Sequence, residues 1–280
     1  MPSFSIVQAS SSNSAFSPTY LPMAVFAFAR YTKGNAHIIL IGRNRAAAES
    51  ILASFPNPST DSDWKHEFVA CDASLMKNIG SAAEELLPRI NFLVISSGYA
   101  SLLGRNETEE GIDHQLAMGY YGRWKFISDL LPALRAANGL GEPSKVMAVL
   151  DPLSSCPVDS TDFGLKFKYS GMTALRASCT YIDMALEEFA IRDPEIAFTR
   201  IMPGFLAAPL IKPMIWAFAK SPDVCAEYML FSLLSGEKGF MRRGEKGDDL
   251  GKKHYFGTED ARKKLWDHTL KAVDVGTGKQ

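Results

Sequence analysis

Residues 36–43 of this 280-residue chain read AHIILIGR. The apolar, largely β-branched run Ala36–Ile41 stops at Gly42, a pattern typical of a strand buried on both faces of a parallel sheet. Four further short apolar runs share this pattern, and each is followed by a glycine, proline or small polar residue. They are Glu67–Cys71, Asn91–Ile95, Lys145–Leu150 and Ile196–Met202. We therefore expect a sheet of parallel strands.

Longer stretches with apolar residues at helical spacing lie between these runs. They are Arg45–Phe55, Met76–Leu87, Asp113–Ala137 and Ser170–Ile191, followed by Ser221–Ser235. This alternation predicts an α/β fold, a doubly wound parallel sheet of the Rossmann-like kind. We interpret residues 1–280 as a single domain, with residues 236–280 as a C-terminal extension: a loop over Gly236–Gly257 and a helix over Glu259–Val273. Ligands of such sheets bind beyond the carboxyl ends of the strands, so the residues there are the candidates for chemistry.

The composition narrows the classes of partner. A formal net charge of −1 at pH 7 and a pI near 6.5 argue against nucleic acid and against an anionic membrane surface. The four cysteines and five histidines are scattered without metal-ligand spacing, so we expect no metal and a reducing compartment. The apolar runs Leu21–Ala29 and Phe205–Ala219 are too short or too interrupted to span a bilayer, and no signal peptide is evident. The expected location is cytoplasmic.

The beginning of the chain departs from this regular pattern. No glycine occurs before Gly34, although a phosphate-binding turn needs bare backbone at this point. Only about ten residues separate Met23–Phe26 from the next predicted strand, too few for a helical crossover. We therefore place the first strand at Phe4–Ala9, a turn at Ser10–Ser14 and the first helix at Leu21–Thr32, so the sheet is degenerate at its first βα unit. The alternative is that residues 4–30 pack poorly.

Short motifs follow several of the predicted strands in an order that is specific when taken together. They are Gly42-Arg43, Cys71-Asp72, Ser96-Ser97-Gly98, Tyr120-Tyr121-Gly122-Arg123, Tyr169-Ser170, Glu187-Glu188-Phe189 and Pro203-Gly204. This set resembles the short-chain dehydrogenase/reductase family, in a fungal branch associated with secondary metabolism, with the glycine-rich cofactor loop missing. The resemblance runs from Val7 to the final helix and implies an NAD(P)-dependent oxidoreductase.

The resemblance implies cofactor contacts at three strand ends. Arg43 stands where the family often binds the 2′-phosphate of NADP, and Asp72 where an aspartate holds the adenine. Ser97 and Gly98 stand in the family's Asn-Asn-Ala-Gly segment. Two plainer interpretations stay open: Arg43 as a solvated charge and Asp72 as the N-cap of the next helix. The cofactor that the resemblance implies is NADP, if the chain binds one. Because the chain lacks the loop glycines, we expect its affinity for NADPH to be weaker than about 1 mM.

The family's catalytic motif is also altered. In its YxxxK motif the tyrosine and lysine face one site, one helical turn apart, but here Tyr169 is followed by the uncharged Thr173. An unassisted tyrosine has a pKa of about 10, so at neutral pH it is a proton donor rather than a base. Asp151 stands where the family often has its serine, and Ser155 could substitute if the loop folds back. Gly119 takes the place of the family's helix asparagine. Alternatively, Tyr169 only packs at the start of a helix.

Three functional hypotheses remain open. The first is a short-chain dehydrogenase/reductase-like oxidoreductase for a ketone or alcohol of a small polyketide or terpenoid, with Tyr169 as proton donor. The second is a non-redox cyclase, isomerase or dehydratase on the same scaffold, with Tyr169, Asp151 or Arg176 as acid or base. The third is an inactive pseudoenzyme, or a mis-spliced chain joined at Phe26–Ala27. The expected partner is a small hydrophobic metabolite. Residues 120–123 could form a dimer surface, so a homo-oligomer is also open.

Overall fold

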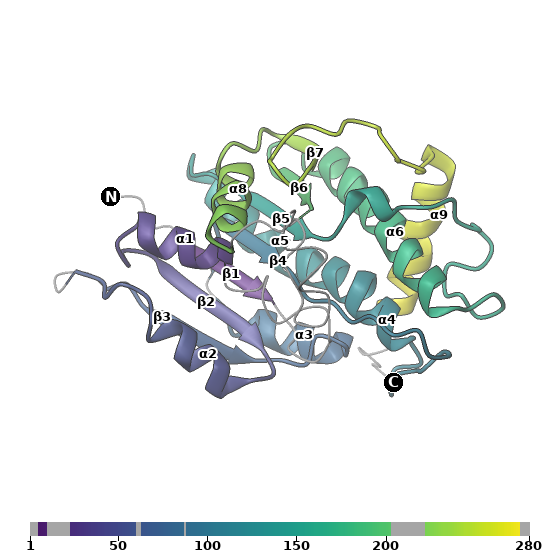
Figure 1. The fold of residues 1–280 in the computed structure, drawn as a ribbon, viewed down its shortest axis with the longest axis horizontal. Helices are drawn as coiled ribbons and strands as arrows, with labels where there is room; N and C mark the ends of the chain where they lie inside the picture. The colour runs from purple at the N-terminus through teal and green to yellow at the C-terminus, as the bar shows by residue number, and fades with distance from the viewer. Residues whose placement is uncertain (1–4, 10–22, 60–62, 87, 203–221, 275–280) are drawn as a thin grey trace, which may run out of the picture.

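The computed structural model describes residues 5–9, 23–59, 63–86, 88–202 and 222–274. Their core is one parallel sheet of seven strands in the order β3-β2-β1-β4-β5-β6-β7 (Figure 1). The strands are β1 (Ser5–Ala9), β2 (His37–Gly42), β3 (His66–Ala70), β4 (Phe92–Ile95), β5 (Lys145–Val149), β6 (Ala197–Ile201) and β7 (Gly239–Arg243). The predicted doubly wound α/β fold is confirmed, and five of its strands lie where apolar runs predicted them.

The first βα unit has the shifted arrangement that the sequence predicted. Strand β1 pairs in parallel with β2 on one side and with β4 on the other, so it lies in the middle of the sheet. Helix α1 (Met23–Tyr31) follows it. The alternative of a poorly packed N-terminal stretch is wrong for these two elements, while the predicted turn Ser10–Ser14 lies outside the described residues.

Strand β7 corrects one prediction. Residues 236–257 were expected to form a loop, yet Gly239–Arg243 pairs with β6 along its whole length. As the edge strand, β7 needs no apolar run, because one side lacks a neighbouring strand and of its side chains only Arg242 is fully buried. The stretch therefore does not carry the signature of a central strand.

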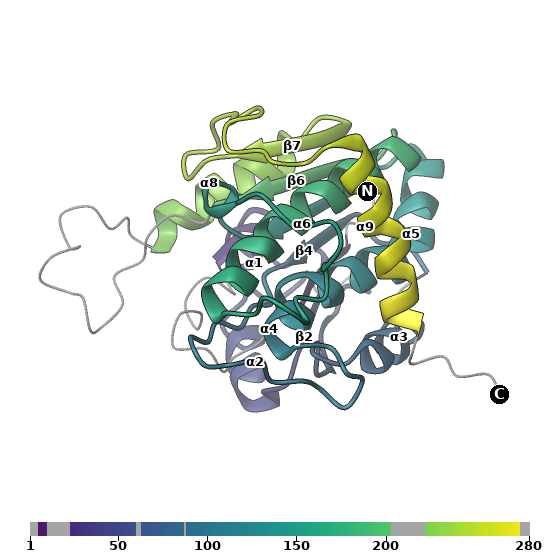
Figure 2. The ribbon, with the colours of Figure 1, turned by 90° about the vertical axis from the view of Figure 1, so that its right-hand side faces the viewer.

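Two layers of helices cover the sheet. One layer contains α1, α2 (Arg45–Leu52) and α8 (Pro222–Leu234), packed around buried residues such as Phe28 and Met229. The other contains α3 (Met76–Glu84), α5 (Gly122–Gly139), α6 (Gly171–Arg192) and α9 (Glu259–Val273). Figure 2 shows helices on both sides of the sheet, with α8 and α2 toward the left and α3, α5 and α9 on the right. None of the helices in the described ranges is both long and apolar enough to cross a bilayer.

The predicted helix Asp113–Ala137 contains an irregular turn. It begins as α4 (His114–Leu116), widens into a π-helical turn at Ala117–Tyr121 and continues as α5. Gly119 lies in that turn against α6, where a Cβ atom would come within 2.7 Å of Ser178 Oγ. The glycine that replaces the family's asparagine therefore permits a close contact between helices.

The C-terminal helix packs on the same layer. Trp266 of α9 lies edge-on against Trp124 of α5 and Phe189 of α6. Arg262 forms ion pairs of 2.9 Å with both Glu187 and Glu188. The Glu-Glu-Phe motif thus holds α9 against α6.

Candidate active site

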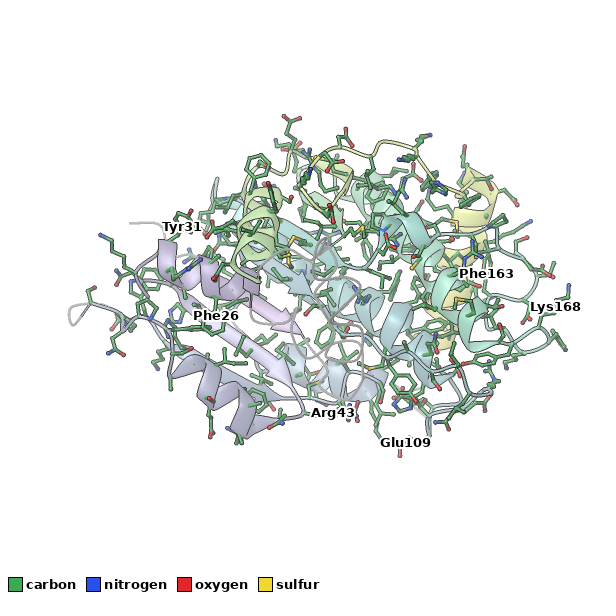
Figure 3. The ribbon with its side chains drawn as sticks, in the orientation of Figure 1. Phe26, Tyr31, Arg43, Glu109, Phe163 and Lys168 are labelled. Carbon is green, nitrogen blue, oxygen red and sulfur yellow. The ribbon has the colours of Figure 1, made fainter. Side chains whose placement is uncertain are left out.

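The residues predicted to carry chemistry lie beyond the carboxyl ends of parallel strands. Arg43 lies just past the end of β2 (Figure 3). Asp72 follows β3, Ser97 and Gly98 follow β4, and Asp151 follows β5. Because all seven strands are parallel, these positions share one edge of the sheet.

Arg43 and Asp72 form one corner of this edge. Their side chains make an ion pair of 3.4 Å, and Asp72 accepts hydrogen bonds from the backbone and hydroxyl of Ser74, at 3.0 and 2.7 Å. Burial opposes ionisation of Asp72, but the bonds from Ser74 and the nearby Arg43 outweigh it and lower the pKa of its carboxyl. This corner therefore presents a fixed carboxylate beside a guanidinium.

A pocket of about 410 Å³ opens at this corner. It is lined by Arg43, Ala70, Cys71, Asp72, Asn78, Ser81, Ala82 and Glu85. The plainer interpretation of Asp72 as the N-cap of the following helix is wrong, because the N-cap of α3 is Leu75. The carboxylate of Glu110 instead accepts hydrogen bonds from the Met76 and Lys77 amides of α3. The Asp72 carboxylate therefore lines the pocket and does not cap helix α3.

The turn after β4 is held rigidly but leaves space above it. Ser97 is buried, and its carbonyl accepts a hydrogen bond from Arg123 Nη2. Its own hydroxyl has no hydrogen-bond partner among the residues that the structure describes. A Cβ atom on Gly98 would meet none of the described residues within 4 Å. A ligand could therefore approach the backbone here.

The loop after β5 turns its polar groups inward. Asp151 accepts hydrogen bonds from the Leu153 amide, at 2.8 Å, and from the Ser154 hydroxyl. Ser155 is buried, donates to Asp183 at 3.2 Å and lies 3.4 Å from an Arg200 nitrogen. The loop does fold back, but it brings Ser155 into a buried network.

Sequence reasoning missed that network. Asp183 of α6 is fully buried and pairs with Arg200 of β6 at 2.7 Å and Arg242 of β7 at 3.2 Å. Arg200 also donates to the Leu150 carbonyl at 3.1 Å, and Arg242 to the Pro152 carbonyl at 2.7 Å. A signal was available, since an arginine inside the apolar run Ile196–Met202 needs a buried partner.

Tyr169 and Thr173 lie at the start of α6 and face different partners. Ser170 is the N-cap and accepts from the Thr173 amide at 3.0 Å, while the Thr173 hydroxyl is exposed and lies 2.7 Å from that of Ser170. Burial, followed by the neighbouring Asp113 carboxylate and its hydrogen bond, raises the pKa of Tyr169 to about 12. At neutral pH the phenol is therefore protonated and able to donate.

The four candidate catalytic residues do not form one hydrogen-bonded set. Within the described ranges, no hydrogen bond joins any two of Tyr169, Thr173, Asp151 and Ser155. Thr173, Asp151 and Ser155 are each bonded to another partner. Their assignment as catalytic stays a prediction. Arg176, the other acid–base candidate, is exposed on α6.

Exposed apolar side chains surround the start of α6. They are Leu102 (82% exposed), Leu103 (77%), Phe167 (86%) and Met172 (51%). The 101–104 loop and the helix touch directly, because a Cβ on Gly171 would lie 1.8 Å from the Ser101 carbonyl. Gln115 fastens them together, accepting from the Ser101 amide at 3.0 Å and donating to the Gly171 carbonyl at 2.7 Å. We call these four side chains the apolar rim.

The comparisons with known proteins agree with this architecture. No profile of a known protein family matches the chain. It is 34% identical over 172 residues to an oxidoreductase of Emericella nidulans, covering 60% of this chain and 49% of that protein. It is 30% identical over 177 residues to an oxidoreductase of Emericella variicolor, covering 62% and 51%. The chain thus spans about half the length of these two relatives.

Further matches extend over most of the chain. A short-chain dehydrogenase/reductase of Stachybotrys chartarum is 22% identical, covering 85% of this chain and 83% of that protein. An uncharacterised protein from Mycobacterium paratuberculosis superposes with a TM-score of 0.71 at 15% identity, covering 98% and 95%. An NADPH-bound carbonyl reductase from chicken fatty liver superposes with a TM-score of 0.63 at 13% identity, covering 90% and 100%. The chain is thus similar in sequence to proteins named as oxidoreductases or as a short-chain dehydrogenase/reductase, and it has the fold of the solved short-chain dehydrogenases/reductases.

Proposed function

We propose that this chain is an NADP(H)-dependent oxidoreductase that acts on a ketone or alcohol of a small, apolar metabolite such as a polyketide or terpenoid. The observation that carries the proposal is the pocket at the ends of β2 and β3, where Arg43 and Asp72 lie together. Relatives named as oxidoreductases support it, as does the superposition on an NADPH-bound reductase.

The described residues fit the two ends of a dinucleotide. Arg43 would hold the 2′-phosphate, since a guanidinium matches phosphate oxygens, and Asp72 would accept from the adenine. At the other end, the space above Gly98 leaves room for the nicotinamide-ribose half. NADPH would supply a hydride there. The stretch that would meet the pyrophosphate lies outside the described residues, and its lack of glycine predicts weak binding.

The residues at the start of α6 would serve the substrate. With its pKa raised to about 12, Tyr169 stays protonated at neutral pH and can donate a proton to a developing alkoxide. The apolar rim carries no charge, which favours a neutral, hydrophobic substrate. We further propose a cytoplasmic location and leave open a homo-oligomer.

Titration of NADPH, NADH and adenosine 2′,5′-bisphosphate by ligand-observed NMR tests the cofactor. We expect NADPH to bind in the millimolar range and Arg43→Ala to weaken NADPH and the bisphosphate about tenfold, with little effect on NADH. Arg45→Ala is the matched control, because this exposed neighbour contacts Glu49 of its own helix. A chain that binds neither NADPH nor the bisphosphate at several times these concentrations would refute the proposal. Turnover is then measured from NADPH absorbance with a panel of apolar ketones.

A second candidate function has one specific observation in its favour. The hydroxyl of Tyr169 lies near the Asp113 carboxylate, which helps to raise its pKa, and position 173 holds a threonine rather than the lysine of the family motif. A proton-donating tyrosine with a carboxylate partner suits a non-redox isomerase or dehydratase equally well. The test is an assay of apolar ketones and alcohols without added NADP(H). Conversion by the wild type that is lost in Tyr169→Phe would support this second function.

A further inference from the structure

Arg123 is a buried arginine that binds only backbone. It lies in the first turn of α5 and is 1% exposed. Its guanidinium donates to the carbonyls of Ile95 at 3.1 Å and Val149 at 3.0 Å, and also to that of Ser97. One side chain thus joins the end of β4, the turn after it and the end of β5.

The charge of Arg123 is held without an acidic partner. The nearby Arg200 pairs with Asp183, but no salt bridge joins Arg123 to a carboxylate among the described residues. Burial, together with the nearby Arg200, lowers the pKa of Arg123 to about 9. An unpaired buried charge opposes folding, so this arginine is retained at a cost to stability.

The turn that Arg123 holds has two features that point to a ligand. The buried hydroxyl of Ser97 and Nε of Arg123 both lack hydrogen-bond partners in the part of the chain that the structure describes. A Cβ atom on the next residue, Gly98, would meet none of the described residues within 4 Å. A turn that Arg123 holds in place, with an unpartnered hydroxyl and room beside Gly98, is suited to bind a polar group of a ligand.

We propose that Arg123 is a positioning residue that sets the Ser97–Gly98 turn to receive the nicotinamide-ribose half of the dinucleotide. This inference rests on the proposed cofactor. A lysine at position 123 keeps the charge but cannot donate to three carbonyls in the planar geometry of a guanidinium. The lysine would lose at least one of the three hydrogen bonds to the Ile95, Ser97 and Val149 carbonyls. Only the half of the ligand that binds at the Ser97–Gly98 turn should then bind more weakly.

Two ligands separate this local effect from general damage. Adenosine 2′,5′-bisphosphate reaches only the pocket of Arg43 and Asp72, whereas NADPH reaches both ends. We expect Arg123→Lys to weaken NADPH about tenfold and the bisphosphate less than about twofold, the loss of one charge-assisted hydrogen bond. A folded Arg123→Lys variant that keeps the wild-type ratio of the two affinities overturns the proposal.

Two further variants guard the interpretation. Arg242→Lys also removes a buried guanidinium from backbone carbonyls, but those of Pro152, Gly251, Lys253 and His254. It should lower the melting temperature and leave the ratio of the two affinities unchanged; a matching change in this ratio would overturn the specific role of Arg123.

Ser97→Ala removes only an unpartnered hydroxyl, so it should fold even if Arg123→Lys does not. It should weaken NADPH a few-fold with the bisphosphate unchanged, and an unaltered NADPH affinity would count against the proposal. Wild-type protein that binds neither ligand refutes the proposed cofactor itself.

Discussion

At the scale of single residues, two glycines that look alike in the sequence have opposite surroundings. A Cβ at Gly98 would meet open space, whereas one at Gly119 would lie 2.7 Å from Ser178 Oγ and 2.9 Å from its Cβ. We expect Gly98→Ala to keep the stability of the wild type and to weaken NADPH binding. Gly119→Ala should lower the free energy of unfolding by about 1–3 kcal/mol through overpacking, without a specific effect on the cofactor. Urea unfolding and NADPH titration of both variants check this pair, and a destabilised Gly98→Ala would contradict it.

Asp183 supports a second prediction at this scale. It is the single carboxylate between Arg200 and Arg242, and all three side chains are buried. Asp183→Asn keeps the shape but leaves two guanidinium groups without their counter-charge, so it should lower the free energy of unfolding by about 3–5 kcal/mol. Glu259→Gln is the control, since its ion pair with Lys263 is largely exposed and should matter little for stability. Similar losses in the two variants, measured by urea unfolding, would show that the buried network contributes little.

At the scale of elements, the docking of α9 depends on a neutral histidine. His268 of α9 lies 2.7 Å from the Tyr121 hydroxyl. Burial first, then the nearby Lys166 and Lys271, lower its pKa, although Asp162 opposes them. The unfolded chain, with a histidine pKa of about 6.5, therefore takes up this proton more readily than the folded chain. The contribution of His268 to stability is present at pH 7–8 and falls as the pH drops below about 6.5.

His268→Gln tests this pH dependence. The glutamine can still accept from Tyr121 but cannot titrate, so the free energy of unfolding should fall less between pH 7.5 and pH 5 than in the wild type. His66, whose pKa burial also lowers, remains in both proteins, so only part of the slope should disappear. Identical slopes in urea unfolding at the two pH values would rule out a role for His268.

Elements with a strong local signal were predictable from the sequence, whereas those defined by tertiary contacts were not. The apolar run Ala36–Ile41 predicted β2 because a strand covered on both faces needs apolar residues throughout. Strand β7 was not predicted from the sequence, because it is an edge strand and its buried side chain is the charged Arg242. The positions of Arg43 and Asp72 at the sheet edge followed from strand order alone. Their ion pair and the partners of Ser155 depend on side chains far apart in the sequence.

At the scale of the whole molecule, the central position of β1 makes Ser5–Ala9 essential to the sheet. β1 bonds to both β2 and β4, so removing it would separate β2 and β3 from the other strands. We expect deletion of residues 1–9 to abolish cooperative unfolding and to yield insoluble protein. Circular dichroism during heating checks this, and a folded truncation at residue 10 would contradict the central position of β1.

The first βα unit also bears on whether a segment is missing from the chain. Phe26 and Ala27, the residues at the suspected junction, lie inside α1, and Phe26 packs edge-on against Phe55. An insertion there would interrupt a helix that also contacts α8, where Arg30 pairs with Glu227 at 2.8 Å. Any attempt to restore glycines should therefore target the stretch before Met23. We continue to propose residues 1–280 as one domain, since β7 and α9 of the C-terminal extension join the main sheet and its helical layer.

The contact between Gly171 and the Ser101 carbonyl sets how the apolar rim can respond to a ligand. The rim loop and the first turn of α6 touch backbone to backbone and share the Gln115 side chain, so neither can shift without the other. If the proposed substrate contacts Leu102 and Met172, it meets side chains whose backbones are held together, so little free energy is lost in ordering them. Selection at these two side chains should then depend on molecular shape, and the 101–104 loop should not have to rearrange before a ligand associates.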